Sequence, residues 1–166
     1  MKVNIALLTV TDTRTFENDK SGAILVKKIE EAKHNLIDRK ICKDKKEDIK
    51  KILKDWINEE NIDVIITTGG TGLTGRDITP EAIDEIADKH IAGFGEIFRN
   101  LSLKTIGTSA IQSRACAVLA KGKYVFALPG SSGGVTDAWD GILKYQLDIN
   151  HKPCNFVELF PRLKEK

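Results

Sequence analysis

Residues 63–72 read DVIITTGGTG, a β-branched run that passes directly into glycines. A short apolar run of this kind, with Asn61 before it and glycines after it, predicts a buried strand at the centre of a sheet. Small residues continue as far as Asp77 and would let backbone N–H groups approach an oxyanion closely. The stretch is therefore a candidate phosphate-binding loop, although a tight connection without a ligand would need the same glycines.

Segments with strand and helix patterns alternate on both sides of this loop. Apolar runs predict further strands at Val3–Val10, Asn35–Cys42 and Tyr124–Leu128. Thr79 before Pro80 predicts a capped helix start. Apolar residues at helical spacing predict the other helices, at Ser21–Lys33, Ile49–Ile57, Phe94–Leu103, Ser109–Ala120 and Val135–Leu147. This alternation predicts an α/β fold with three α/β/α layers and a mostly parallel central sheet, joined by right-handed crossovers.

Length and composition predict one domain over residues 1–166. The chain has 166 residues, 41% of them hydrophobic, which is enough for one packed core and too few for two. Its 26 basic and 24 acidic residues leave a net charge of +2, which argues against nucleic acid or a membrane as the main partner. Three widely spaced cysteines form neither a disulfide framework nor a zinc motif, so we expect reduced thiols and a cytoplasmic location.

A second small-residue loop and two aspartates could complete an anion site. Residues 128–134 read LPGSSGG, between a predicted strand and a predicted helix, where amides and hydroxyls can receive an anion. Asp44 follows the strand Asn35–Cys42, so its carboxylate and that of Asp77 could face one cleft and hold Mg²⁺ on phosphate oxygens. The charged run around Asp44 would look the same in a solvated loop, and Asp77 could instead form a local turn bond.

Other chemistries find less support in the sequence. Gly70, Gly72 and Gly75 match G-x-G-x-x-G, and a nicotinamide-dependent oxidoreductase rests on that match alone. In a dinucleotide site the pattern opens a helix directly, whereas here residues 76–80 intervene. None of the three histidines lies beside a serine or cysteine in a nucleophile motif, and Cys116 is expected to fill the core.

Several motifs, taken together and in order, resemble the MoaB/Mog family. They are TTGGTG at 67–72, RDITPEA at 76–82, GFGE at 93–96, Ser113-Arg114 and LPG at 128–130. The resemblance covers nearly the whole chain, and the shared order of the motifs is far more specific than any one glycine pattern. The chain length and the sequence PCNF at 153–156 are similar to the MoaB branch.

The resemblance implies a molybdopterin-binding fold and a role in molybdenum cofactor assembly. The reaction it implies is adenylylation of molybdopterin by ATP with Mg²⁺, releasing pyrophosphate. A non-catalytic molybdopterin-binding or carrier protein of the same pathway is the alternative. Family members form trimers or hexamers, and a homo-oligomer would agree with apolar surface at Phe94, Phe98, Phe156 and Phe160.

The family's functional residues can be carried over to matching positions. Its two aspartates fall on Asp44 and Asp77, which would place Mg²⁺ and the triphosphate. Backbone N–H groups of the glycine loop would contact oxyanions, at Gly69, Gly70, Thr71 and Gly72. The resemblance implies further pterin and phosphate contacts from Gly95, Glu96, Ser113, Arg114, Pro129, Gly130 and Ser131. Attack of an acceptor phosphate on the ATP α-phosphorus needs no protein nucleophile, which agrees with the sequence.

Overall fold

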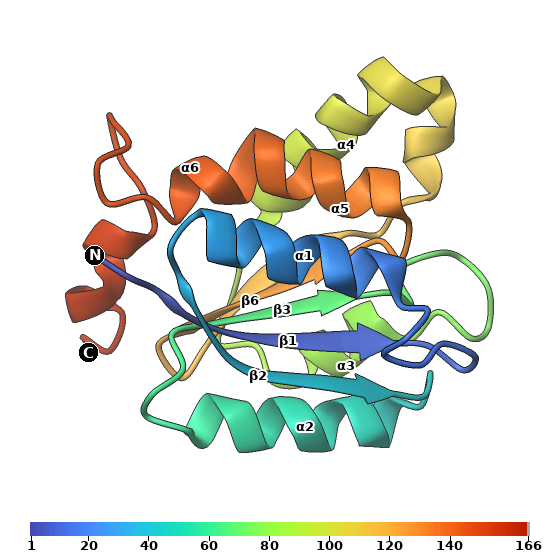
Figure 1. Ribbon diagram of the computed structural model, residues 1–166, viewed down its shortest axis with the longest axis horizontal. Coiled ribbons are helices and arrows are strands. Elements are labelled where there is room, and N and C mark those ends of the chain that lie inside the picture. Colours follow the sequence, from blue (N-terminus) through green and yellow to red (C-terminus); the bar gives the residue numbers. More distant parts are fainter. Residues whose placement is uncertain (166) are drawn as a thin grey trace.

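A computed structural model describes residues 1–165, in which six strands form one sheet in the order β2-β1-β3-β6-β5-β4 (Figure 1). The parallel strands are β1 (Asn4–Val10), β2 (Asn35–Cys42), β3 (Val64–Thr68) and β6 (Lys123–Leu128). Strand β5 (Cys116–Ala120) is antiparallel to β6, and the short β4 (Lys89–His90) is antiparallel to β5. The predicted mostly parallel sheet is confirmed.

Helices cover both faces of the sheet and make the three layers (Figure 1). One face carries α1 (Lys20–Glu31), α4 (Ala92–Ile106) and the continuous run α5 (Ser132–Ala138), η2 (Trp139–Leu143) and α6 (Lys144–Gln146). The other carries α2 (Lys46–Asn58) and α3 (Thr79–Asp84). Two 3₁₀ segments, η1 (Gly107–Gln112) and η3 (Val157–Arg162), follow α4 and α6. Within residues 1–165, no helix is long and apolar enough to cross a membrane.

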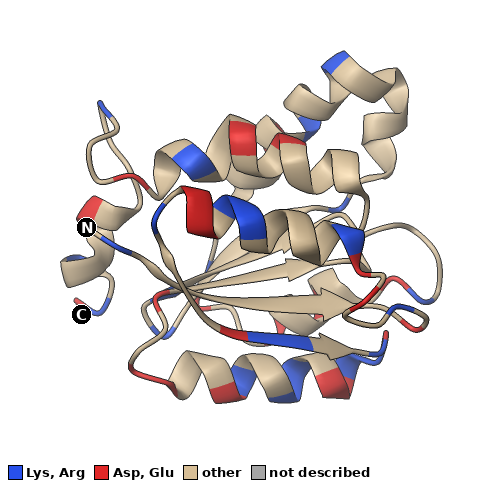
Figure 2. Ribbon diagram, viewed as in Figure 1, with Lys and Arg blue, Asp and Glu red and all other residues tan. Residues whose placement is uncertain are grey.

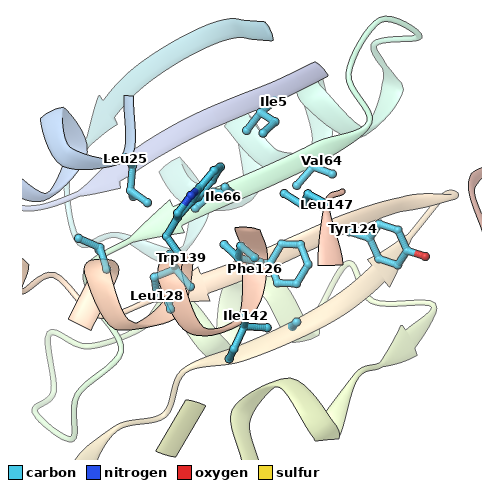
Figure 3. Packing of buried hydrophobic residues seen from close by; sticks show 14 of the residues in the cluster. Ile5, Leu25, Val64, Ile66, Tyr124, Phe126, Leu128, Trp139, Ile142 and Leu147 are labelled. Atoms are coloured by element: carbon cyan, nitrogen blue, oxygen red, sulfur yellow. The ribbon is translucent and has the colours of Figure 1, made fainter. Parts of the chain in front are cut away.

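The central strands read as continuous apolar runs because both of their faces are buried. Ile5 and Ile66 point into a cluster formed with α1, α4 and α5, which also contains Trp139 (Figure 3). The neighbouring Ala6 and Ile65 belong to a second cluster, which packs against α2 and α3. Every residue of β3 is buried, as its β-branched sequence predicts.

The parallel strands end at a common edge of the sheet. Val10 pairs with Cys42, and Thr68 pairs with both Thr9 and Leu128. The loops that follow these strands therefore leave the sheet side by side, at the right of Figure 1. In parallel α/β sheets this carboxyl edge is where ligands bind.

The predicted helix over Ser109–Ala120 is wrong in its second half. Strand β5 occupies this part and joins β6 through Lys121-Gly122, whose φ angles are +48° and +76°. Positive φ at both residues is typical of the two-residue turn of a β-hairpin, and glycine favours it. Ala117 and Val118 pack into clusters on opposite faces of the sheet, as neighbours in a strand do. The apolar residues of this stretch also recur at helical spacing, which is why the sequence pattern predicts a helix. Gly122 thus turns a hairpin and does not end a helix.

Two smaller predictions also need correction. Thr79 is the first residue of α3 and does not cap it; Ile78 holds the cap position without a side-chain bond. Phe94 and Phe98 are 4% and 1% exposed, so they belong to the core and not to an apolar surface. Phe156 and Phe160 are partly buried against the Tyr124 ring, with centroids 4.6 and 5.7 Å from it. The tail thus packs back on the domain.

Candidate substrate-binding cleft

A cleft of about 360 Å³ lies at the carboxyl edge of the sheet. It is formed by the loops after β1, β3 and β6 together with Asp44, which follows β2. Acidic and basic residues gather in the loops at this end of the molecule (Figure 2). The lining residues are Val10, Thr11, Thr13, Arg14, Asp44, Thr68, Gly69, Gly70, Gly130 and Ser131. The two predicted small-residue loops therefore meet, and Asp44 joins them.

Glycine is required at two positions of the first loop. Gly69 and Gly70 have φ angles of +104° and +67°, which favour glycine. A Cβ at Gly69 would overlap the Val10 carbonyl oxygen, and one at Gly70 would overlap the Thr79 hydroxyl. The N–H of Gly69 donates to Leu128 O at 3.0 Å, so it is not available to an oxyanion. Within residues 1–165 the N–H groups of Gly70 and Thr71 form no hydrogen bond, which suits them to bind an anion.

Two side chains hold this loop from behind. The Thr79 hydroxyl donates to Gly69 O at 2.9 Å, while its N–H donates to Gly70 O at 3.0 Å. The Arg114 guanidinium donates to Gly72 O and Asp77 O, each at 2.7 Å, and pairs with Glu81. Since each of its three guanidinium nitrogens is engaged by the protein, Arg114 positions the loop. That pairing holds the pKa of Glu81 below its ordinary value.

Asp77 uses one carboxylate oxygen within the loop. Its Oδ2 accepts hydrogen bonds from the Thr74 N–H at 2.9 Å and the Thr74 hydroxyl at 2.7 Å. Burial raises the pKa of Asp77, but the hydrogen bonds from Thr74 and the Gly72 backbone, together with the charge of Arg114, outweigh it, so the net pKa lies below the ordinary value. The side chain is thus ionised at neutral pH, and it forms the local turn bond that was the alternative to a ligand role.

Asp44 lies beside the glycine loop in the lining of the cleft. Its Oδ1 lies 3.2 Å from the place a Cβ would take on Gly70. Burial raises the pKa of this carboxyl, and so do the negative charges of Asp12 and Asp77, while Arg76 offsets part of the effect. A partly buried carboxylate beside like charges is stabilised by a bound cation.

Asp12 and Arg76 connect the loop after β1 to the end of the glycine loop. Arg76 Nη2 lies 2.5 Å from Asp12 Oδ2, and its Nε lies 3.0 Å from the same oxygen. The N–H of Asp44 donates to Asp12 Oδ1 at 3.2 Å. Neither the glycine motifs nor the family resemblance pointed to this loop, which also carries Arg14. Its signal was its position directly after the first predicted strand.

Comparisons with known proteins identify the family of this chain. Residues 6–148 match a domain family described as a probable molybdopterin binding domain. The chain belongs to the MoaB/Mog family. It is 43% identical over 161 residues to molybdenum cofactor biosynthesis protein B of Escherichia coli strain K12, covering 97% of this chain and 93% of that protein. The corresponding Bacillus cereus protein is 44% identical over 147 residues, covering 88% and 87%.

Solved structures of the MoaB/Mog family share the fold. A crystal structure of molybdenum cofactor biosynthesis protein B superposes with a TM-score of 0.89 at 38% identity, over 100% of this chain and 98% of that one. The tungsten cofactor synthesizing protein MoaB from Pyrococcus furiosus superposes with a TM-score of 0.81 at 29% identity, over 99% and 98%. By homology this member of the family is a molybdenum cofactor biosynthesis protein.

The remaining predicted residues of this family member fall into two groups. Gly130 and Ser131 line the cleft, and Pro129 O accepts a hydrogen bond from the Thr68 hydroxyl at 2.7 Å. Gly95, Glu96 and Ser113 do not line it. Gly95 lets α4 approach β5, because a Cβ there would lie 2.6 Å from the Ala115 carbonyl oxygen. Glu96 is exposed on α4, and Ser113 Oγ accepts from the Ala115 N–H at 3.3 Å.

The side chains present fit Mg²⁺ only in part. Among residues 1–165 no group of three or more His, Cys, Asp or Glu side chains could hold a metal ion. Asp44 and the remaining oxygen of Asp77 would supply few ligands, so phosphate oxygens and water would have to complete the coordination. Mg²⁺ is commonly held in this way in phosphate sites.

Cysteine chemistry does not contribute a nucleophile here. Burial raises the pKa of the Cys42 thiol to about 12 and that of Cys116 to about 11, so both are protonated at neutral pH. The Gly70-x-Gly72-x-x-Gly75 match does not open a helix, since α3 begins at Thr79. The loop therefore differs from a dinucleotide-binding turn.

Proposed function

We propose that this protein transfers the adenylyl group of Mg-ATP to molybdopterin and releases pyrophosphate. The observation that carries the proposal is the cleft in which Asp44 faces the glycine loop and the Gly130-Ser131 turn. Carboxylate, backbone amides and a polar turn at one sheet edge are the groups that position phosphates and their cation. The family membership of the chain supports the same reaction class.

The chemistry needs alignment and charge neutralisation. A phosphate oxygen of molybdopterin attacks the α-phosphorus of ATP, and a new P–O bond forms there. The bond from that phosphorus to the oxygen bridging to the β-phosphate breaks, and its electron pair leaves with pyrophosphate. No protein nucleophile takes part. Positioning of the two phosphates supplies most of the rate enhancement.

The chain's own groups have separate tasks in this reaction. The N–H groups of Gly70 and Thr71 would donate to phosphate oxygens that become more negative in the transition state. The start of α5 at Ser131 would receive a second phosphate. Asp44, with Asp77, would hold Mg²⁺, which when bound neutralises charge on the triphosphate.

A binding or carrier function is the second candidate, and one observation favours it. Asp77 Oδ2 is engaged by Thr74, and residues 1–165 contain no cluster of three metal ligands. A protein whose aspartates serve loop structure alone could hold molybdopterin without transferring anything to it. Such a protein would bind the pterin and release no pyrophosphate.

Pyrophosphate release separates the two functions. We would supply Mg²⁺, ATP and molybdopterin to the parent protein, to Asp44→Asn and Asp77→Asn, and to Asp55→Asn as an exposed control on α2. The adenylyltransferase predicts release by the parent and the control, and a loss of about 100-fold or more in Asp44→Asn and in Asp77→Asn. Molybdopterin binding by a parent that releases no pyrophosphate would support the carrier instead.

A further inference from the structure

Arg14 is the cationic side chain in the wall of the cleft. It follows β1, whose carboxyl end opens towards the glycine loop. Its Nη1 donates to Gly130 O at 3.0 Å and to Ser21 Oγ at 3.1 Å. The side chain thus connects the loop after β1 with the loop after β6, at the lining of the cleft.

Buried groups hold Arg14 in this place. Ser21 is fully buried at the start of α1, and its hydroxyl donates to Asp19 Oδ1 at 3.3 Å. Asp19 is 1% exposed and accepts from the Thr9 hydroxyl at 2.6 Å and from Arg39 Nη2 at 3.0 Å. Hydrogen bonds therefore run from the sheet interior to Arg14 in the cleft. Such support fixes a side chain before its ligand arrives and lowers the entropic cost of binding.

The rest of the guanidinium has no partner in the described chain. Within residues 1–165, Nε and Nη2 of Arg14 form no hydrogen bond, and no carboxylate pairs with it. The nearby Asp12 is engaged by Arg76 and does not compete for it. A guanidinium held at one nitrogen presents its other N–H groups as a planar fork, which matches the oxygens of a phosphate.

We propose that Arg14 binds a phosphate group of the substrate in this cleft. The two sources of that phosphate, the triphosphate of ATP and the phosphate of molybdopterin, follow from the proposed function, on which the inference rests. Arg14 is held at Gly130 O, whereas Asp44 lies beside Gly70, so the anion site and the cation site would be supplied by different loops of the cleft.

Direct binding measurements test this assignment. Affinities for Mg-ATP and for molybdopterin would be measured separately by calorimetry for the parent, Arg14→Gln, Arg14→Lys and Lys20→Gln. The last variant removes the same charge from the exposed start of α1, outside the cleft. We expect Arg14→Gln to weaken one ligand by about 10- to 100-fold, Arg14→Lys to weaken it less, and Lys20→Gln to leave both affinities within about twofold.

The affinities test the role of Arg14 whether or not the protein releases pyrophosphate. The ligand that weakens identifies which phosphate Arg14 contacts, and a thermal melt of each variant verifies that it is folded. Unchanged affinities in Arg14→Gln, or equal losses in Lys20→Gln, overturn the assignment even if the parent releases pyrophosphate. If the parent binds both ligands without releasing pyrophosphate, the proposed adenylyltransferase function is contradicted. The ratio of the Arg14→Gln affinity to the parent affinity then still tests the phosphate contact of Arg14.

Discussion

Replacing Arg114 by leucine should destabilise the fold, because its guanidinium clamps the glycine loop. Its bonds to Gly72 O and Asp77 O are both 2.7 Å long, and its side chain is about two-thirds buried. A hydrogen bond from a charged donor contributes about 1.5–3 kcal/mol, and the low end suits a partly exposed group. The pair with the half-exposed Glu81 adds about 0.5 kcal/mol. We therefore expect the free energy of unfolding to fall by about 3–4 kcal/mol.

Urea denaturation measures this change directly. With a denaturant slope of about 2 kcal/mol/M for a chain of this size, the midpoint should fall by about 1.5–2 M. Arg114→Lys is the matched variant, since it keeps the charge and loses the fork that reaches two carbonyls, and it should lose an intermediate amount. Glu81→Gln, alone and combined with Arg114→Leu, isolates the ion pair in a double-mutant cycle.

Ligand binding by the Arg114 variant separates a clamp on the loop from a contact with the substrate. The family resemblance implies that Arg114 lines the pterin and phosphate site, whereas the structure engages each of its nitrogens with the protein. Suppose that the free energy of unfolding of Arg114→Leu is within about 0.5 kcal/mol of the parent value, while its affinity for molybdopterin or Mg-ATP is about tenfold weaker. Arg114 would then contact the bound substrate, and its role as a clamp on the loop would be refuted.

Three further predictions concern the loop, the pH dependence and the surface. Gly69→Ala should cost about 2–4 kcal/mol in urea denaturation, whereas Gly93→Ala, where a Cβ meets nothing within 4 Å, should be nearly neutral. Burial lowers the pKa of His34 below its ordinary value of 6.5, against the opposing charge of Asp148, so stability should be constant above about pH 6.5 and decline as the pH falls through it. His34→Gln should flatten that decline in melts between pH 5 and 8. We expect a homo-oligomer, and Ile111→Glu, at a position 82% exposed, should shift it to smaller species in sedimentation.

The parallel strands could be predicted from the sequence, because burial on both faces restricts which residues they can contain. A strand covered on both faces reads as a near-continuous apolar run, so Val3–Val10 and residues 63–68 were recognisable without their neighbours. Strand β5 was not, because alanine and leucine suit either structure and their spacing fits a helix. The pairing with β6 across a two-residue turn decides the outcome, and that contact is tertiary.

The site was predictable to a similar extent. Glycine at positions 69 and 70 indicated close backbone approach, and the structure accounts for it with Val10 O and Thr79. The role of Arg114 could not be predicted, since its partners lie more than 30 residues away in the chain. The loop that carries Arg14 contains no recognisable motif. It would have been included if the residues after every predicted parallel strand had been taken as site candidates, because ligands bind at the carboxyl ends of such strands.

The charges of the cleft favour a substrate that brings its own cation. Burial and the charge of Asp12 raise the pKa of Asp44, and Arg76 compensates only part of this. A bare triphosphate would add negative charges beside that carboxylate, whereas a triphosphate carrying Mg²⁺ offers it a positive centre. Arg14, held at the Gly130 turn, would then attract the phosphate oxygens that the cation leaves uncovered. Opposite charges on different loops of the cleft would orient a phosphate chain, and in-line attack on its α-phosphorus needs such an alignment.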